Sequence, residues 1–178
     1  KSMFYIVNNK DRNGLIRDCA RKLVDSGKKV LILVVRVGHG EVLVDMLEDE
    51  FKVDYLDGKK STKQRLNAIE DMKEGRLDIL IASKIFDQGV DIPQLDALIV
   101  AGSGKSSGRA LQRIGRVIRP FEGKSSAIVV DFFDNAKYLR DHSEKRIEIY
   151  SSEPGFKLKL SSKIPRKKKK ARPTNWTS

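Results

Sequence analysis

Val30-Leu31-Ile32-Leu33-Val34-Val35 is the most informative segment of this 178-residue chain for its fold, and Leu98-Ile99-Val100 has the same apolar composition. Both runs are continuously apolar and rich in branched residues, without the polar alternation of a strand that has one wet face. Strands of this kind occur in parallel sheets that carry helices on each side. The two stretches therefore predict the centre of an α/β domain.

Similar short runs alternate with segments of helical period along the whole chain. The expected strands are 4–7, 30–35, 53–56, 79–82, 97–101 and 127–132, and the expected helices are 14–26, 41–51, 62–74, 108–119 and 135–149. Ser61 and Asn135 can cap helix N-termini, while Gly27 and Gly75 follow expected C-termini. This order predicts a doubly wound, mainly parallel sheet, whose ligands bind at the carboxyl ends of the strands.

The charge of the chain is distributed unevenly. There are 36 Lys and Arg against 24 Asp and Glu, a formal net charge of +12, and 39% of residues are hydrophobic, which excludes wholesale disorder. Nine of the basic residues follow residue 156 and no acidic residue follows Glu153, so residues 1–156 carry only +3. We therefore expect a compact domain over residues 1–153 and a basic, flexible tail over residues 154–178.

The cysteine and histidine content and the hydropathy of the chain argue against disulfide bonds, a structural metal site and a membrane span. Cys19 is the one cysteine, and His39 and His142 lie far apart, so neither a disulfide nor a structural metal cluster is expected. A reducing, cytoplasmic location follows from the cysteine usage. No apolar run approaches the length that spans a bilayer, and the chain begins with Lys1 rather than Met, as expected of the cut end of a longer protein.

The segment Gln112-Arg113-Ile114-Gly115-Arg116-Val117-Ile118-Arg119 is expected to carry chemistry. On a helix, Gln112, Arg116 and Arg119 share an arc of about 60°, opposite the apolar residues. Two arginines one turn apart repel each other unless an anion lies between them, and a polyphosphate is such an anion. A solvated basic face is the simpler alternative, although the mid-helix Gly115 costs about 1 kcal/mol relative to Ala.

A second segment, residues 81–93, begins where a buried strand ends. Ser83 brings a hydroxyl to the carboxyl edge of the strand, Gly89 allows close approach of a ligand, and Asp91 is an acceptor before the turn at Pro93. Such a loop can offer donors to a nucleic-acid phosphate and a carboxylate to a ribose. A tight structural turn explains the same residues equally well.

Taken together, the two segments resemble the second RecA-like domain of superfamily 2 helicases and translocases. Ala-Ser-Lys-Ile-Phe-Asp-Gln-Gly-Val-Asp-Ile-Pro, residues 82–93, is similar to motif V of that family, and Gln112 to Pro120 is similar to motif VI. The run from Val30, with Gly40-Glu41-Val42-Leu43, resembles motif IV, and Leu56-Asp57-Gly58 resembles the segment before motif V. The resemblance covers about residues 28–133 and implies a RecA-like α/β fold.

The resemblance also implies roles for individual residues. Arg116 and Arg119 would reach the γ-phosphate of ATP, with Arg119 as the arginine finger, and Gln112 would couple the nucleotide to the domain interface. Gly89 and Asp91 would approach the sugar of the nucleotide. Ser83 would contact the nucleic-acid backbone. Apart from the resemblance, basic residues beside these motifs and in the tail are expected to contact nucleic acid: Lys84, Lys105 and the run Lys167, Lys168, Lys169 and Lys170.

Two differences from the family pattern indicate which branch of superfamily 2 helicases the chain resembles. Ser83 stands where the family usually has Thr, and Gln88 stands where DEAD-box RNA helicases have Arg. The resemblance is therefore nearer to Rad25-like and phage recombination-repair helicases, which implies DNA as the partner. ATP with Mg²⁺ is the implied cofactor, with its metal ligands on a RecA-like domain upstream of this chain.

The segment Gly102-Ser103-Gly104-Lys105-Ser106 imitates a phosphate-binding loop. The Walker A template needs a glycine five positions before Gly104, and Ile99 stands there. We interpret the segment as a loop that leads into the arginine helix and contacts nucleic acid through Lys105. If that is right, the chain lacks the phosphate cradle and does not hydrolyse ATP by itself.

Two alternatives stay open at this point. The first is a non-catalytic module that binds nucleic acid through the basic tail, where lysines neutralise phosphates and Trp176 stacks on a base. The same basic string also suits a nuclear-localisation signal. The second is a small nucleotide-binding enzyme that uses Gly102 to Ser106.

Overall fold

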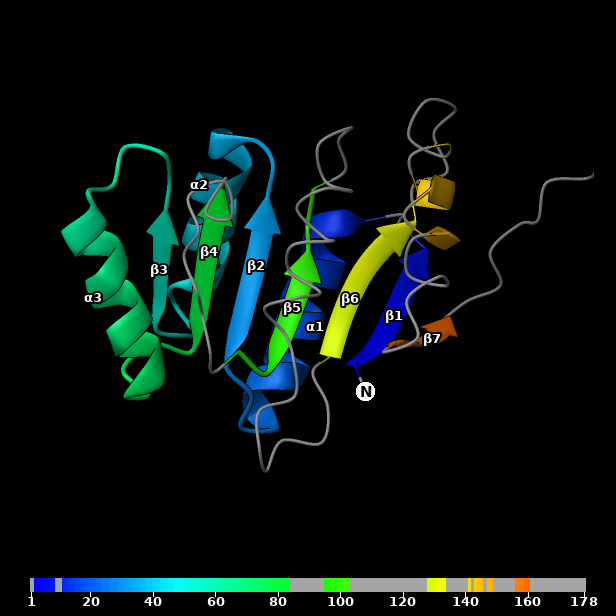
Figure 1. The fold of residues 1–178 in the computed structure, drawn as a ribbon, viewed down its shortest axis with the longest axis horizontal. Coiled ribbons are helices and arrows are strands. Elements are labelled where there is room, and N and C mark those ends of the chain that lie inside the picture. The colour runs from blue at the N-terminus through cyan, green and yellow to red at the C-terminus, as the bar shows by residue number, and fades with distance from the viewer. Residues whose placement is uncertain are drawn as a thin grey trace, which may run out of the picture.

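The structure is a computed structural model that describes residues 2–8, 11–83, 95–102, 128–133, 141, 143–145, 147–148 and 156–160. Within these ranges the strands are β1 (Ser2–Asn8), β2 (Val30–Val34), β3 (Val53–Leu56), β4 (Ile79–Ser83), β5 (Ala97–Val100), β6 (Ile128–Phe133) and β7 (Phe156–Leu160). They form one sheet in the order β3-β4-β2-β5-β6-β1-β7, and every pairing is parallel (Figure 1). The predicted parallel sheet is confirmed.

Three helices in the described residues connect the strands: α1 (Arg12–Asp25), α2 (Val37–Leu47) and α3 (Thr62–Lys73). The connections through α1 and α2 run toward the β3 edge, whereas the connection through α3 runs back from β3 to β4. Because such crossovers are right-handed, the return must pass over the opposite face. Figure 1 shows α1 and α2 behind the sheet and α3 on the other side, beside β3 and β4. The predicted doubly wound α/β architecture is therefore present.

The core divides between the two faces of the sheet. Alternate residues of the central strands, such as Val30 and Ile32 on β2, form one buried cluster with α1 and α2. The intervening residues Leu31 and Leu33 point to the face covered by α3, whose Ile69 and neighbouring apolar residues are also buried. All residues of β2, β4 and β5 are buried, as their unbroken apolar runs predicted. No helix in the described ranges has the length and apolarity needed to cross a membrane.

The helix ends follow the expected local signals. Gly27 and Gly75 adopt positive φ of 75° and 73° immediately beyond α1 and α3, a conformation that glycine adopts without a Cβ penalty. Ser61 caps α3 in a capping box: its hydroxyl accepts the N–H of Gln64, whose side chain accepts the N–H of Ser61. These three predicted boundaries are confirmed.

The expected bounds of one helix were wrong. The helix predicted over residues 41–51 extends instead from Val37 to Leu47, four residues earlier at each end. Its first turn contains Gly38 and Gly40, which made this part resemble a loop, and its cap residue Arg36 makes no side-chain capping bond. Tertiary packing of Gly40 against Tyr55 therefore overrides weak local propensity here.

A strand also lies where the sequence predicted a tail. β7 pairs in parallel with β1, so that Ser2 is opposite Phe156 and Ile6 is opposite Leu160. The sequence Phe-Lys-Leu-Lys-Leu does alternate apolar and basic residues with the period of a strand, but the basic composition of its surroundings concealed this signal. The expectation of a tail from residue 154 omitted this strand, and residues 161–178 lie outside the described residues.

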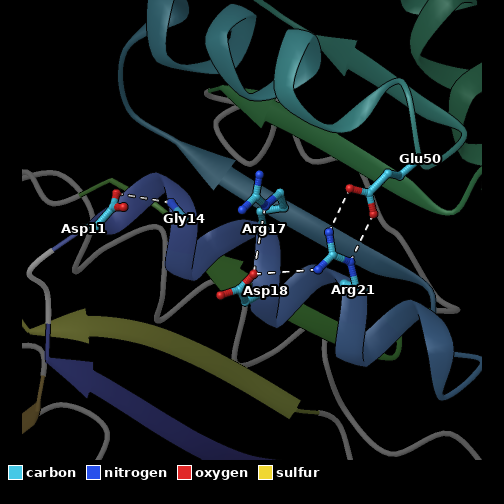
Figure 2. Close-up of polar contacts among 6 residues, drawn as sticks. All are labelled: Asp11, Gly14, Arg17, Asp18, Arg21 and Glu50. Carbon is cyan, nitrogen blue, oxygen red and sulfur yellow. Dashed lines mark hydrogen bonds and ion pairs between the residues drawn. The ribbon is translucent and has the colours of Figure 1, made fainter.

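At the edge of the sheet where the strands begin, the amino edge, two carboxylates accept hydrogen bonds from the backbone of neighbouring segments. Asp96 accepts the backbone N–H of Lys29 at 2.8 Å, and Asp78 accepts that of Lys52 at 2.9 Å. On the surface above, Arg21 of α1 forms a two-pronged ion pair with Glu50 after α2, at 3.0 and 2.8 Å (Figure 2). Because this pair is exposed, it orients the two helices more than it stabilises the fold.

The cap of α3 gives a testable consequence. We expect Ser61→Ala to lower the free energy of unfolding by about 1 kcal/mol, because the N–H of Gln64 loses its acceptor. Ser61→Asp keeps an acceptor at the cap and serves as the matched control, with stability close to that of the wild type. Urea denaturation of the three proteins measures the difference, and equal midpoints for all three would contradict the capping role.

Candidate functional site

The carboxyl ends of the central strands bring distant parts of the chain together. Val34 at the end of β2 is in register with Ser83 at the end of β4, and Leu33 is in register with Val100 of β5. The carboxyl ends of β2, β4 and β5 therefore share one edge, as expected of a parallel sheet. This edge is the candidate site.

Ser83 lies just below the surface of this edge. It is 4% exposed and, alternating with Ile79 and Ile81 along β4, it points toward the face covered by α1 and α2. Its Oγ lies 3.5 Å from the hydroxyl oxygen of Tyr55 on the neighbouring strand β3. The structure thus places this predicted residue at the expected edge, with its side chain turned toward a neighbour in the same domain.

Tyr55 joins three elements at this edge. Its hydroxyl donates to the carbonyl oxygen of Val37 in the first turn of α2, at 3.1 Å. Its ring occupies the space beside Gly40, where an added Cβ would lie 2.4 Å from the ring carbon Cζ. Burial raises the pKa of the Tyr55 phenol, opposed by the Ser83 hydroxyl, so Tyr55 is protonated and able to donate at neutral pH.

The first turn of α2 is the exposed part of the site. Residues 35–38 are all exposed, with Val35 38% and Val37 42% accessible, and Arg36 lies between them. No side chain caps this helix end. The positive end of the helix dipole and the Arg36 guanidinium therefore face solvent together, an arrangement that favours anions such as phosphate.

His39 connects the first turn of α2 to α1. Its Nε2 lies 2.9 Å from Oδ1 of Asn13. Because that oxygen only accepts, Nε2 carries the proton and donates. Burial, followed by the positive charge of Arg12, lowers the pKa of His39 below its usual value of 6.5, which favours the neutral ring. His39 therefore holds the two helices together as a neutral donor.

Gly102 has a packing role that bears on the apparent phosphate-binding loop. An added Cβ there would lie 2.9 Å from both the backbone nitrogen and Cγ2 of Val35. The chain is held in this position by the N–H of Ala101, which donates to the carbonyl of Leu33 at 2.9 Å. A glycine is thus required by the close passage of β5 beside the end of β2, whether or not a phosphate is present. The remainder of the segment, residues 103–106, lies outside the described ranges.

The predicted site residues other than Ser83 are not tested by the structure. They lie outside the described residues and stay predictions: Lys84, Gly89, Asp91, Lys105, Gln112, Arg116, Arg119, Lys167, Lys168, Lys169 and Lys170. Sequence reasoning in turn missed Tyr55, which makes the contacts to Ser83 and α2. An aromatic residue in a short edge strand carries no local signal for such a role. Gly40 was noticed only as part of a motif.

Comparison with known proteins matches a segment that includes the candidate edge of the sheet. The family model for the helicase conserved C-terminal domain matches residues 14–120, more than half of the chain. Among curated proteins, the ATP-dependent DNA helicase uvsW of Enterobacteria phage T4 is 29% identical over 161 residues, covering 80% of this chain and 32% of that protein. The UvrABC system protein B of Staphylococcus aureus (strain Mu50) is 29% identical over 132 residues, covering 71% of this chain and 20% of that protein. The chain thus spans a third or less of these relatives.

Solved structures show the same fold. The crystal structure of T4 UvsW superposes with a TM-score of 0.69 at 24% identity, covering 89% of this chain and 41% of that one. The C-terminal domain of the DEAD-box protein Dbp5 superposes with a TM-score of 0.67 at 20% identity, covering 89% of this chain and 88% of that one. At these identities, the likeness establishes the architecture of the sheet and helices.

Gly40 and Gly38 form a matched pair for testing the packing of Tyr55. We expect Gly40→Ala to destabilise the domain by about 1–3 kcal/mol, because the new methyl group overlaps the Tyr55 ring. An added Cβ at Gly38 meets nothing within 4 Å, so Gly38→Ala should change stability by less than about 1 kcal/mol. Urea denaturation measures both, and equal effects would show that Tyr55 does not occupy this space.

The lowered pKa of His39 predicts a pH dependence of stability. The unfolded chain takes up a proton on this histidine at a higher pH than the folded chain does. The contribution of His39 is therefore complete above about pH 6.5 and is lost as the pH falls toward its folded pKa. Chemical denaturation at a series of pH values from 7 to 5 should show a shallower decline for His39→Gln than for the wild type. Parallel declines would be the contrary result.

Proposed function

Because the chain belongs to the helicase conserved C-terminal domain family, with the RecA-like α/β fold of such domains, we propose that it is the C-terminal motor domain of an ATP-dependent DNA helicase or translocase. Such a motor binds ATP between two RecA-like domains and moves a nucleic-acid strand as the cleft opens and closes. The chain would supply part of the strand's path and an arginine finger. The phosphate cradle would belong to an N-terminal RecA-like domain of the same protein.

The observation that carries this proposal is the meeting of Ser83 with the first turn of α2 at one edge of the sheet. The exposed N-terminus of α2, with Arg36 beside it, suits a backbone phosphate. Ser83 is nearly covered, so the strand would meet α2 first and the Ser83 hydroxyl second. Lys84 and Lys105 would extend the same path.

The ATP site of this proposal rests on the family resemblance. Arg119 and Arg116 would reach the γ-phosphate from across the cleft, Gln112 would relay its presence, and Gly89 and Asp91 would face the sugar. The packing of Gly102 against Val35 accounts for that glycine without a phosphate, which supports placing the cradle and the Mg²⁺ ligands in the other domain. ATP with Mg²⁺, when bound, supplies the phosphoryl group whose developing charge the two guanidinium groups would neutralise.

DNA is proposed over RNA on two grounds. One relative is an ATP-dependent DNA helicase by name, and Gln88 stands where the DEAD-box pattern has Arg. The lysines 167–170 would add affinity by releasing counterions from phosphates. We further propose a cytoplasmic location: Cys19 is the one cysteine, and burial raises the pKa of its thiol above the usual value, consistent with an unreactive reduced residue. The basic run after residue 165 keeps a nuclear location as the alternative.

A non-catalytic nucleic-acid-binding module is the second candidate function. The observation in its favour is that nine basic residues follow residue 156, with no acidic residue among them. Such a module would bind nucleic acid through the tail and would have no ATP hydrolysis to lose. The two functions therefore differ in what the arginine helix does.

Arg119 provides the deciding experiment, made in the full-length protein that contains this chain. We expect Arg119→Ala to reduce nucleic-acid-stimulated ATP hydrolysis by about 10³-fold or more, because the transition-state charge loses its partner. Binding of a labelled single strand should be retained.

Arg76→Ala is the control for Arg119→Ala. Arg76→Ala removes an exposed arginine that pairs with Asp71 near the amino edge, and it should leave hydrolysis unchanged. Hydrolysis that survives Arg119→Ala would contradict the arginine-finger assignment. A wild-type protein that binds the strand without hydrolysing ATP would favour the binding module.

A further inference from the structure

We propose that Tyr55 is a positioning residue, which holds Ser83 and the first turn of α2 at a set separation and thereby controls the affinity for nucleic acid. This inference rests on the proposed function, because it assumes that Ser83 and α2 form part of the strand's path. Tyr55 itself would not touch the strand.

The geometry gives Tyr55 contacts with both partners at once. It lies on β3, the edge strand of the sheet, which is paired with β4 along one side. From there its hydroxyl lies 3.1 Å from the carbonyl oxygen of Val37 and 3.5 Å from Oγ of Ser83. A single side-chain oxygen thus links the helix that follows β2 to the end of β4. The segments it joins are the two parts of the described chain assigned to phosphate contact.

The number of protons on the two hydroxyl groups indicates which group donates in each of the two contacts of Tyr55. The Tyr55 hydroxyl has one proton, and the Val37 carbonyl can only accept, so the Tyr55 proton goes to Val37 along the shorter contact. The Ser83 hydroxyl is then the group available to donate across the longer contact to the Tyr55 oxygen, because a hydroxyl can both donate and accept. At 3.5 Å this second contact is at the outer limit of hydrogen bonding, so the packed ring sets the separation of the two oxygens more than the strength of the bond does. An arriving phosphate oxygen would therefore accept a hydrogen bond from the Ser83 hydroxyl in place of the Tyr55 oxygen, while the bond from Tyr55 to α2 remains.

The packing of the ring makes this link rigid. Because the space beside Gly40 is filled by the Tyr55 ring, the ring cannot shift toward α2, and the hydroxyl is held near Val37. Val53 and Tyr55 both pack against the core cluster that lies between the sheet and helices α1 and α2, and this packing fixes the position of β3. A hydroxyl that is held by both its ring and its bond can act as a spacer between two phosphate-contacting segments.

Tyr55→Phe tests the inference because it removes the hydroxyl and keeps the ring beside Gly40. In the full-length protein, we expect the concentration of single-stranded DNA that half-saturates ATP hydrolysis to rise by about two- to tenfold, the usual net effect of losing such hydrogen bonds. The maximal rate should fall by a smaller factor. Ser26→Ala is the matched control, because it removes a hydroxyl bonded to the carbonyl of Lys22 at the far end of α1.

A double-mutant cycle with Ser83→Ala separates the possible outcomes. If Tyr55 acts through Ser83, Tyr55→Phe should have little further effect on half-saturation once Ser83 is Ala. Full additivity of the two effects, or no effect of Tyr55→Phe alone, would overturn the inference. If Ser83→Ala has no effect while Tyr55→Phe does, then the proposed path past Ser83 is wrong and the spacer role falls with it. Urea denaturation of each variant separates these effects from a loss of folding.

Discussion

The structure depends on the burial of β2 between β4 and β5. Every residue of this strand is covered, and its backbone is paired in parallel on both sides. Parallel strands cannot be joined by tight turns, so the chain must cross over the sheet between them, and the right-handed sense of each crossover decides which face each helix covers. The layered arrangement of α1, α2 and α3 thus follows from one apolar strand that must be covered from both sides.

The same constraint creates the candidate site. Parallel pairing places the ends of β2, β4 and β5 at one edge, while the carboxylates of Asp78 and Asp96 fasten the opposite edge. The candidate edge is built differently, from close approaches at glycines. Gly40 makes room for the Tyr55 ring, and Gly102 lets the chain pass the backbone of Val35. Side chains there would push apart the segments that the proposed function needs close together.

The two halves of the proposed site, the nucleic-acid path and the ATP site, are supported by different kinds of evidence. The path for nucleic acid is argued from described contacts among Ser83, Tyr55 and the first turn of α2. The residues proposed to face ATP, Arg116 and Arg119 among them, are argued from motifs that resemble those of the family to which the chain belongs. The two halves are argued separately, because residues 84–94 and 103–127, which contain most of both motifs, lie outside the described residues.

From the sequence alone we could predict the parallel sheet, six of its strands to within two residues at each end, and the caps at Ser61, Gly27 and Gly75, because these features depend on patterns within a few residues. The sequence also placed Ser83 at the end of a strand. It misplaced α2, because two glycines disguise the first turn, and it missed β7, because lysines hide the alternation. The role of Tyr55 was decided by tertiary structure alone. Its hydroxyl meets Val37, 18 positions away, and Ser83, 28 positions away, and no local pattern records which strand will lie beside which helix.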